Sequence, residues 1–268
     1  MPFYEEEVQY LETNINKLPS REDQVVFYGS SSIRLWPDFQ DCFPWKTINL
    51  GFGGSTIAAC AWFMPRLLFR FKPKGLVIYA GDNDLATERL PEEVYNNLRL
   101  MIFDIRRTLG PIPVFFISIK PSPARFHLRS EIERTNQMTH QFITDEQNLH
   151  YVDVHSHMLD NQGQPLETLY VEDLLHLSQK GYNIWTKVIG QKLEQHLTTF
   201  SDTTSLAYSD MRLIDNNGTV IADSYWTTRR NNYDDLHVLL AANTICLLYT
   251  SDAADEGLGV DLGGRRII

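Results

Sequence analysis

The sequence VVFYGSSSIRLW, residues 25–36, joins an apolar run directly to a glycine and three serines. The apolar run is typical of a buried β-strand, whereas glycine and serine favour a tight turn and the N-cap of a helix. This order predicts a strand that turns sharply into a helix. A serine at such a junction could simply cap the helix. It could also be a nucleophile, because open α/β sheets bind ligands at the carboxyl ends of their strands, and helix N-termini stabilise negative charge.

Segments typical of strands and of helices alternate through the first 197 residues. The expected strands are short apolar runs at 24–28, 47–49, 76–80, 114–118 and 151–154. The expected helices repeat apolar residues at helical spacing, near 8–18, 56–71, 91–109, 128–146 and 178–197. Such alternation is typical of a parallel sheet with helices on both faces. We therefore expect an α/β fold, a three-layer α/β/α sandwich around a five-stranded parallel sheet.

The sequence changes character after residue 197. Residues 198–205, TTFSDTTS, are polar without a clear period, which indicates a linker. Residues 211–223, MRLIDNNGTVIAD, predict a β-hairpin, because Asn217 and Gly218 form a favoured two-residue turn between apolar strands. A single hairpin is too small to fold alone.

The last residues, 246–268, have no convincing amphipathic pattern. They resemble the peptide produced when sequencing-library adapter is translated at the end of a truncated reading frame. We therefore expect residues 1–197 to form the folded α/β domain. Residues 198–268 are expected to be a linker, a possible hairpin fragment and a poorly ordered or artefactual tail.

The composition excludes several classes of partner and site. The chain carries 24 Lys and Arg against 34 Asp and Glu, a net charge of -10, and its basic residues form no long run, so nucleic acid is not expected to bind. The first residues lack the basic start and apolar core of a signal peptide, and no apolar run could span a bilayer, so we expect a cytoplasmic protein. Cys42, Cys60 and Cys246 are odd in number and widely spaced, which indicates neither a disulfide framework nor a zinc site.

Chemically useful residues follow the expected strands in four separate segments. The first segment supplies Ser31, and the second, NLGFGGST, supplies Gly54 within glycines that let a ligand approach the backbone. The third, YAGDNDL, supplies the amide of Asn83, and the last, VEDLLHLSQKGY, places Asp173 three residues before His176. Together they offer a nucleophile, two oxyanion donors, an orienting acid and a base.

This combination resembles the SGNH hydrolases, or GDSL esterases, from about Val25 to Trp185. The resemblance implies a flavodoxin-like sheet and a catalytic triad of Ser31, His176 and Asp173. It also implies an oxyanion hole formed by the backbone amides of Ser31 and Gly54 and the side chain of Asn83. Ester hydrolysis would then proceed through an acyl-serine intermediate, with no cofactor and no metal.

The chain departs from the family pattern at one position, where Ser30 replaces the aspartate of Gly-Asp-Ser. Counting from Gly29 to Trp36 keeps Ser31 as the nucleophile, with Ser30 supporting the turn and Ser32 entering the helix. A subgroup of the family reads like this chain in FYGSSSIRLW, GFGGSTIA, AGDNDLA and IKPSPAR. The GxSxG elbow of the ordinary α/β-hydrolases is absent from the sequence.

Four further residues are candidates for substrate binding. Arg34, Lys120 and Arg125 could hold an anionic substrate, although ion pairs within so acidic a chain are the favoured alternative. His155 could line the cleft.

Other polar and aromatic residues have structural interpretations. A metal site built from Asp153, His155 and His157 is the weaker interpretation of that segment. Asp82 and Asp84 are expected to hold a loop through hydrogen bonds. The tryptophans expected in the core or cleft wall are Trp36, Trp62 and Trp185.

The expected partner is a small-molecule ester, and the open cleft of the family suits short acyl esters, including acetylated sugars. A thioesterase or a lysophospholipase would use the same residues. A non-catalytic binding module that keeps the fold is the alternative from a different class. The oligomeric state is not indicated.

Overall fold

The computed structural model describes residues 1–144 and 146–197, together with four short strands at 213–214, 220–222, 259–260 and 266–267. The chain divides into two compact units, residues 1–204 and 205–268. The predicted linker, the Asn217–Gly218 turn, Cys246 and most of the terminal stretch lie outside the described residues.

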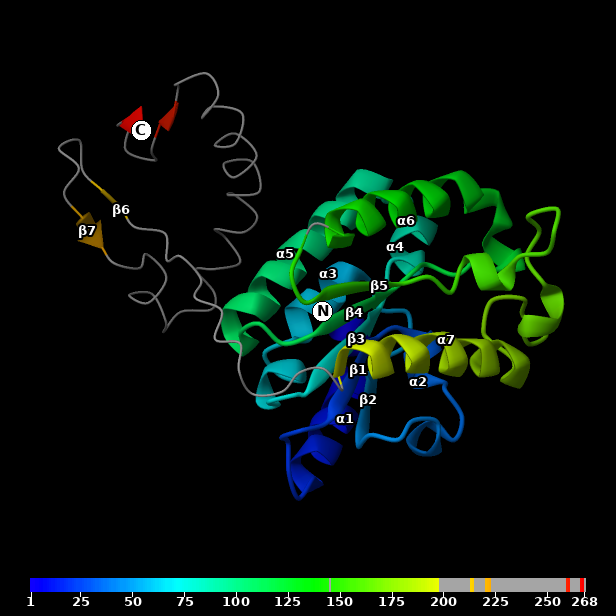
Figure 1. Ribbon diagram of the computed structural model, residues 1–268, viewed down its shortest axis with the longest axis horizontal. Coiled ribbons are helices and arrows are strands. Elements are labelled where there is room, and N and C mark those ends of the chain that lie inside the picture. The colour runs from blue at the N-terminus through cyan, green and yellow to red at the C-terminus, as the bar shows by residue number, and fades with distance from the viewer. Residues whose placement is uncertain (145, 198–212, 215–219, 223–258, 261–265, 268) are drawn as a thin grey trace. The chain divides into compact units, whose positions relative to one another are not determined.

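A five-stranded parallel sheet forms the centre of the first unit, in the order β2-β1-β3-β4-β5 (Figure 1). Its strands are β1 Val25–Gly29, β2 Thr47–Gly51, β3 Gly75–Tyr79, β4 Val114–Ile117 and β5 Leu149–Val152. In the parallel register, Val25 of β1 pairs with Thr47 on one side and Gly75 on the other. This confirms the predicted sheet, although β5 begins two residues earlier than expected. All the carboxyl ends therefore meet at one edge.

Helices cover both faces of the sheet (Figure 1). The α-helices are α1 Glu5–Lys17, α2 Ser31–Arg34, α3 Ile57–Phe63, α4 Asp82–Ala86, α5 Pro91–Leu109, α6 Arg129–Thr144 and α7 Gln179–Leu197. The 3-10 helices are η1 Pro2–Tyr4, η2 Phe39–Asp41, η3 Leu68–Arg70, η4 Pro123–Leu128, η5 Ser156–Met158 and η6 Glu167–Leu169. None of the helices among the described residues is both long and apolar enough to cross a membrane.

The predicted helix at 56–71 is broken. Helix α3 ends at Phe63 and a turn leads to η3, because Pro65 has no N–H for a helical hydrogen bond and its ring clashes with the preceding turn. The short helix α4 was not expected, since the sequence around Asn83 indicated a loop.

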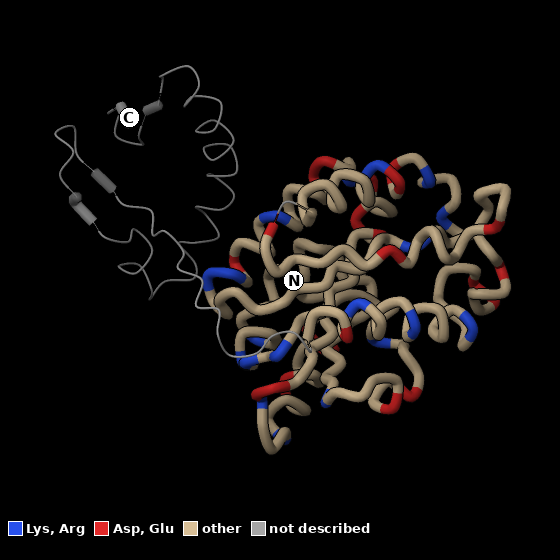
Figure 2. The backbone as a smooth tube through the Cα atoms, viewed as in Figure 1, with Lys and Arg blue, Asp and Glu red and all other residues tan. Residues whose placement is uncertain are grey.

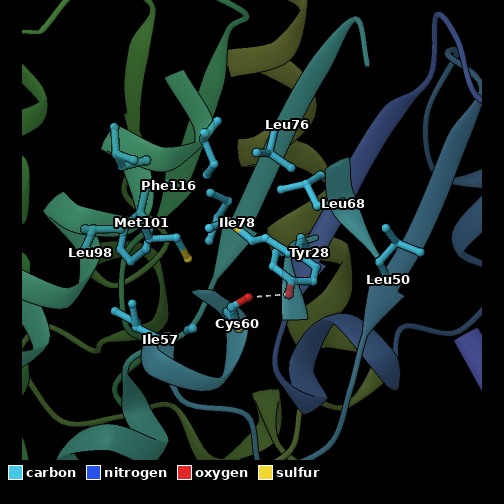
Figure 3. Close-up of a cluster of buried hydrophobic side chains, with 14 of the residues drawn as sticks. Tyr28, Leu50, Ile57, Cys60, Leu68, Leu76, Ile78, Leu98, Met101 and Phe116 are labelled. Carbon is cyan, nitrogen blue, oxygen red and sulfur yellow. Dashed lines mark hydrogen bonds between the residues drawn. The ribbon is translucent and has the colours of Figure 1, made fainter. Parts of the chain in front are cut away.

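Two apolar clusters form the core, one on each face of the sheet. Alternate side chains of β1 point to opposite faces: Val26 and Tyr28 lie in the cluster with α1, α3, α5 and α6, while Val25 and Phe27 lie in the cluster with α2 and α7. Figure 3 shows the first cluster, where the Tyr28 hydroxyl donates to the carbonyl of Cys60 at 2.6 Å. The three-layer α/β/α sandwich is thus confirmed.

The tryptophans do not all lie where the sequence indicated. Trp36 and Trp185 are buried in the second cluster, as expected. Trp62 is 42% exposed and does not line the cleft described below, so its interpretation as core or cleft wall is wrong. The reason is that α3 is short and its buried face is formed by other residues, including Ile57, Cys60 and Phe63, so Trp62 lies outside that face.

The second unit contains two antiparallel strand pairs. β6, Leu213–Ile214, pairs with β7, Val220–Ala222, which are the two arms of the predicted hairpin. β8, Gly259–Val260, pairs with β9, Arg266–Ile267, in the terminal stretch where no regular pattern was expected.

Candidate active site

The nucleophile candidate lies where β1 meets α2. At Gly29 the backbone has a φ of 143°, and a Cβ there would lie 1.9 Å from the carbonyl oxygen of Tyr79, so only glycine fits. The chain then turns through Ser30, whose carbonyl accepts the N–H groups of Ile33 and Arg34 at 2.9 and 3.1 Å. Ser31 is the first residue of α2 and lines an open cleft.

The neighbouring serines have different environments. The hydroxyls of Ser30 and Ser32 are buried and have no hydrogen-bond partner. Ser30 therefore supports the turn through its backbone carbonyl, not through its side chain. Of the three hydroxyls, that of Ser31 is the one that contacts a histidine.

His176 and Asp173 lie beside Ser31. The Nε2 atom of His176 lies 3.0 Å from the Oγ atom of Ser31, and its Nδ1 atom lies 2.6 Å from Oδ2 of Asp173. A carboxylate only accepts hydrogen bonds, so Nδ1 carries the proton and Nε2 is the acceptor that faces the serine hydroxyl. The three groups form a continuous hydrogen-bonded chain that ends in the cleft.

The loop itself holds the carboxylate of Asp173. Its Oδ1 atom accepts the backbone N–H groups of Leu175 and His176, both at 2.9 Å. Desolvation alone would raise the pKa of Asp173, but the hydrogen bonds from the His176 ring and from these two amides lower it to about 2. Asp173 is therefore ionised at neutral pH and can orient the imidazole.

The glycine loop after β2 also lines the cleft, through Gly53 and Gly54. Gly54 adopts a φ of 67°, a left-handed conformation that favours glycine. Its carbonyl accepts the Tyr4 hydroxyl at 3.2 Å, and the N–H of Gly53 donates to Oε2 of Glu7 at 2.7 Å. The N-terminal segment thus holds this loop from outside. The sequence analysis missed Tyr4 and Glu7, because no local motif marks a contact between residues 46 or 50 positions apart.

Asn83 lies in α4, beyond the carboxyl end of β3. Its Nδ2 atom donates to the carbonyl of Ser55 at 3.1 Å, and its Oδ1 atom accepts from Arg125 at 2.9 Å. The next acid, Asp84, is buried, and both its oxygens accept the N–H of Ile57, at 3.1 and 3.0 Å. Burial raises the pKa of Asp84 to about 7, although the bond from Ile57 opposes this. Asp84 thus ties α4 to the start of α3, which agrees with its expected role.

One cleft of about 520 Å³ brings these groups together. It is lined by Phe3, Tyr4, Glu6, Glu7, Ser31, Arg34, Gly53, Gly54, Asp82, Asn83, Leu175 and His176. Four of the five residues predicted for catalysis line it, and Asp173 lies behind His176. Such a site can deprotonate a serine hydroxyl and offer N–H donors to a developing oxyanion.

The structure places one of the four substrate-binding candidates in the cleft, and it shows the favoured alternative, an ion pair, for Lys120 and Arg125. Arg34 lines the cleft, 3.6 Å from Glu7, but Lys120, Arg125 and His155 do not line it. Lys120 and Arg125 form ion pairs with Asp82, whose Oδ2 atom lies 2.8 Å from Nζ of Lys120 and 3.0 Å from Nη1 of Arg125. His155 lines a separate small pocket with Arg125, and burial lowers its pKa.

The segment around Asp153 forms a local turn. Both carboxylate oxygens of Asp153 accept from Ser156, one from its N–H at 3.1 Å and one from its hydroxyl at 2.7 Å. In the described part of the chain, no three His, Cys, Asp or Glu side chains are close enough together to hold a metal ion.

Comparison with known proteins agrees with this architecture. The structure is similar to that of a Bacteroides fragilis protein assigned as an acylhydrolase, with 22% identity, a TM-score of 0.63, and coverage of 70% of this chain and 96% of that chain. A GDSL-like lipase from Bacteroides thetaiotaomicron gives 21% identity, a TM-score of 0.60, and coverage of 70% and 97%. A family 3 carbohydrate esterase from Clostridium thermocellum gives 18% identity, a TM-score of 0.51, and coverage of 68% of this chain and 100% of that chain. At these identities the likeness shows the fold alone.

Sequence comparison identifies the family. No curated protein sequence matches the chain. The sequence pattern of the GDSL-like lipase/acylhydrolase family matches residues 26–184, which is more than half of the 268 residues. The chain therefore belongs to the GDSL-like lipase/acylhydrolase family of esterase-type hydrolases.

Proposed function

We propose that this protein is a serine esterase that hydrolyses short-chain acyl esters of small molecules. The observation that carries the proposal is the hydrogen-bonded chain from Asp173 through His176 to Ser31, which ends in an open cleft. All five residues assigned to catalysis lie between residues 1 and 197, so we propose that this segment is the catalytic domain.

The reaction begins with attack of the Ser31 Oγ atom on the ester carbonyl carbon. As the new C–O bond forms, the hydroxyl proton moves to Nε2 of His176, and the carbonyl electron pair moves onto the oxygen. The oxyanion accepts hydrogen bonds from the backbone amides of Ser31 and Gly54 and from Nδ2 of Asn83. Asp173 keeps the imidazole oriented and stabilises its positive charge.

The tetrahedral intermediate then collapses. The C–O bond to the leaving alcohol breaks, and His176 returns its proton to that alcohol, which leaves an acyl-serine. A water molecule attacks the acyl carbon while His176 takes its proton. The second collapse releases the carboxylic acid and restores the Ser31 hydroxyl.

The residues around the cleft support a short acyl group. Charged side chains, those of Glu6, Glu7 and Arg34, lie among its walls. A long apolar acyl chain would desolvate such groups without replacing their hydrogen bonds, which is unfavourable. A small acyl group needs less apolar surface and leaves the charged wall to a polar alcohol.

The test is turnover of p-nitrophenyl acetate, butyrate and octanoate by the purified protein and three serine variants. We expect acetate to be preferred and Ser31→Ala to lower kcat by about four orders of magnitude or more. Ser30→Ala and Ser32→Ala are matched controls, because each removes a buried hydroxyl with no partner. They should keep most of the activity.

Other outcomes would contradict the proposal. An active Ser31→Ala protein beside an inactive Ser32→Ala protein would show that the nucleophile is misassigned. A preference for octanoate would exclude the short-acyl assignment. Faster turnover of a thioester or a lysophospholipid, assayed beside the p-nitrophenyl esters, would favour those alternative substrates. A folded wild-type protein that turns over no ester would indicate a binding module.

A further inference from the structure

We propose that Arg125 is a positioning residue for the oxyanion hole: it fixes the side-chain amide of Asn83 with its NH2 group toward the reacting oxygen. The inference rests on the proposed esterase function. It concerns a residue that does not line the cleft and would act only through Asn83.

The two partners of Asn83 allow a single orientation of its amide. Guanidinium groups only donate hydrogen bonds, so the Asn83 oxygen must face Arg125, at 2.9 Å. A carbonyl oxygen only accepts, so the Asn83 nitrogen must face Ser55, at 3.1 Å. A flipped amide would place two donors together on one side and two acceptors together on the other. The NH2 group carries two hydrogens, and Ser55 uses one of them, which leaves the second for an oxyanion.

A buried ion network holds Arg125 in place. Its Nη1 atom lies 3.0 Å from Oδ2 of Asp82, and Lys120 donates to the same oxygen at 2.8 Å. The side chains of Lys120, Asp82 and Arg125 are 1%, 6% and 15% exposed. Desolvation alone would raise the pKa of Asp82, but the charges of Lys120 and Arg125 keep it below the ordinary value. This ion pair restrains the guanidinium, although the Nη1 atom makes no hydrogen bond with the carboxylate.

The charge of the network also suits the reaction. Two cations share one carboxylate directly beside Asn83, which leaves a net positive charge among largely buried side chains. A cation at the Asn83 oxygen polarises the amide, so that its NH2 group donates more strongly to the negative charge that develops on the ester oxygen. The network therefore acts on the transition state more than on substrate binding.

The experiment compares Arg125→Met and Arg125→Lys with Arg129→Met, on p-nitrophenyl acetate. Arg129 is a suitable control, since its side chain is 43% exposed and pairs with Glu133 on its own helix. We expect Arg125→Met to lower kcat by roughly 10- to 100-fold with KM changed by about twofold or less, as for loss of orientation of an oxyanion donor. Arg125→Lys keeps the charge but lacks the fork that reaches both Asp82 and Asn83, so it should lose part of kcat. Arg129→Met should match the wild type.

A double-mutant cycle with Asn83→Ala separates positioning from general destabilisation. If Arg125 acts through Asn83, Arg125→Met should change kcat by less than about threefold once Asn83 is alanine. An undiminished loss in that background, or an unchanged kcat in the single variants, would overturn the inference. If Arg125→Met does not fold, as shown by the lack of a cooperative thermal transition, the same double-mutant cycle is measured with Arg125→Lys. Failure of the esterase assignment is distinguishable, because Ser31→Ala would then keep the wild-type rate.

Discussion

The functional groups of the active site are held in two different ways. His176 and Asp173 lie on a loop with side chains 29% and 47% exposed, and most of their hydrogen bonds are made within four residues. By contrast, Asn83 and the glycine loop are held by residues from distant parts of the chain, including Arg125 and Glu7.

The difference follows from what each set of groups must do. A histidine base must gain and lose a proton, so it needs access to the cleft and one partner that sets its tautomer. Oxyanion donors must keep fixed directions before any charge appears, and hydrogen bonds from distant parts of the chain supply that rigidity. The carboxyl groups show the same contrast, because burial raises the pKa of Asp84 to about 7 while local hydrogen bonds lower that of Asp173 to about 2. Four substitutions test this division.

Asp173→Asn should have the largest effect. The asparagine NH2 group would favour the wrong tautomer of His176, so kcat should fall by about three to four orders of magnitude. Steady-state kinetics on p-nitrophenyl acetate measure this, and Glu172→Gln is an isosteric control at the adjacent exposed position. A loss of tenfold or less would mean that the loop needs no charge at this position.

Asn83→Ala should lower kcat by about two to three orders of magnitude with a smaller change in KM, because its donor strengthens only as charge develops on the oxygen. Asn183→Ala is the control. Asn183 is exposed on α7, and its Oδ1 atom accepts a hydrogen bond from Gln179, one turn earlier in the same helix. If the change were confined to KM, Asn83 would be a contact of the bound substrate and not an oxyanion donor.

Glu7→Ala should have a smaller effect, a loss of roughly tenfold in kcat/KM, because Gly53 would lose its acceptor and Gly54 could shift. The kinetics should be compared with those of Glu12→Ala, which removes a carboxylate of the same helix that pairs with Arg66, away from the glycine loop. Equal losses in the two variants would indicate that only the docking of α1 matters.

Asp84→Asn should act on stability, not on the chemical step. At pH values between the unfolded pKa, near 3.9, and the folded pKa of about 7, Asp84 is protonated in the folded protein and ionised in the unfolded chain. The free energy of unfolding of the wild type should therefore fall as pH rises through this window. The Asp84→Asn variant should not show this fall, because asparagine does not titrate. Between pH 5 and pH 8, urea unfolding should show the variant gaining up to about 3 kcal/mol relative to the wild type, about 1.4 kcal/mol for each of the two pH units below the folded pKa. A constant difference at both pH values would contradict the raised pKa.

The sequence predicted the parts of the fold that depend on neighbours along the chain. Apolar runs identified all five strands, and the spacing of Asp173 and His176 identified a pair that the structure places 2.6 Å apart. The break of the expected helix at Pro65 is also readable from the residue type, because proline has no N–H for a helical hydrogen bond. The excess of acidic residues favoured ion pairs for Lys120 and Arg125, which the structure shows, but the sequence could not identify Asp82 as their partner.

The sequence by itself determined the three-layer class, the turn that presents Ser31, and the local loop that orients His176, since these rest on backbone preferences and contacts a few residues apart. Only the tertiary structure decided which charges face the cleft and which lie behind it. Lys and Arg are interspersed with Asp and Glu throughout the described chain, so their pairing cannot be read from composition (Figure 2). Arg125 reaches Asn83 across 42 residues because the parallel sheet gathers the loops at the carboxyl ends of its strands at one edge. Glu7 reaches Gly53 across 46 residues because α1 packs on the sheet through Val8 and Ile15.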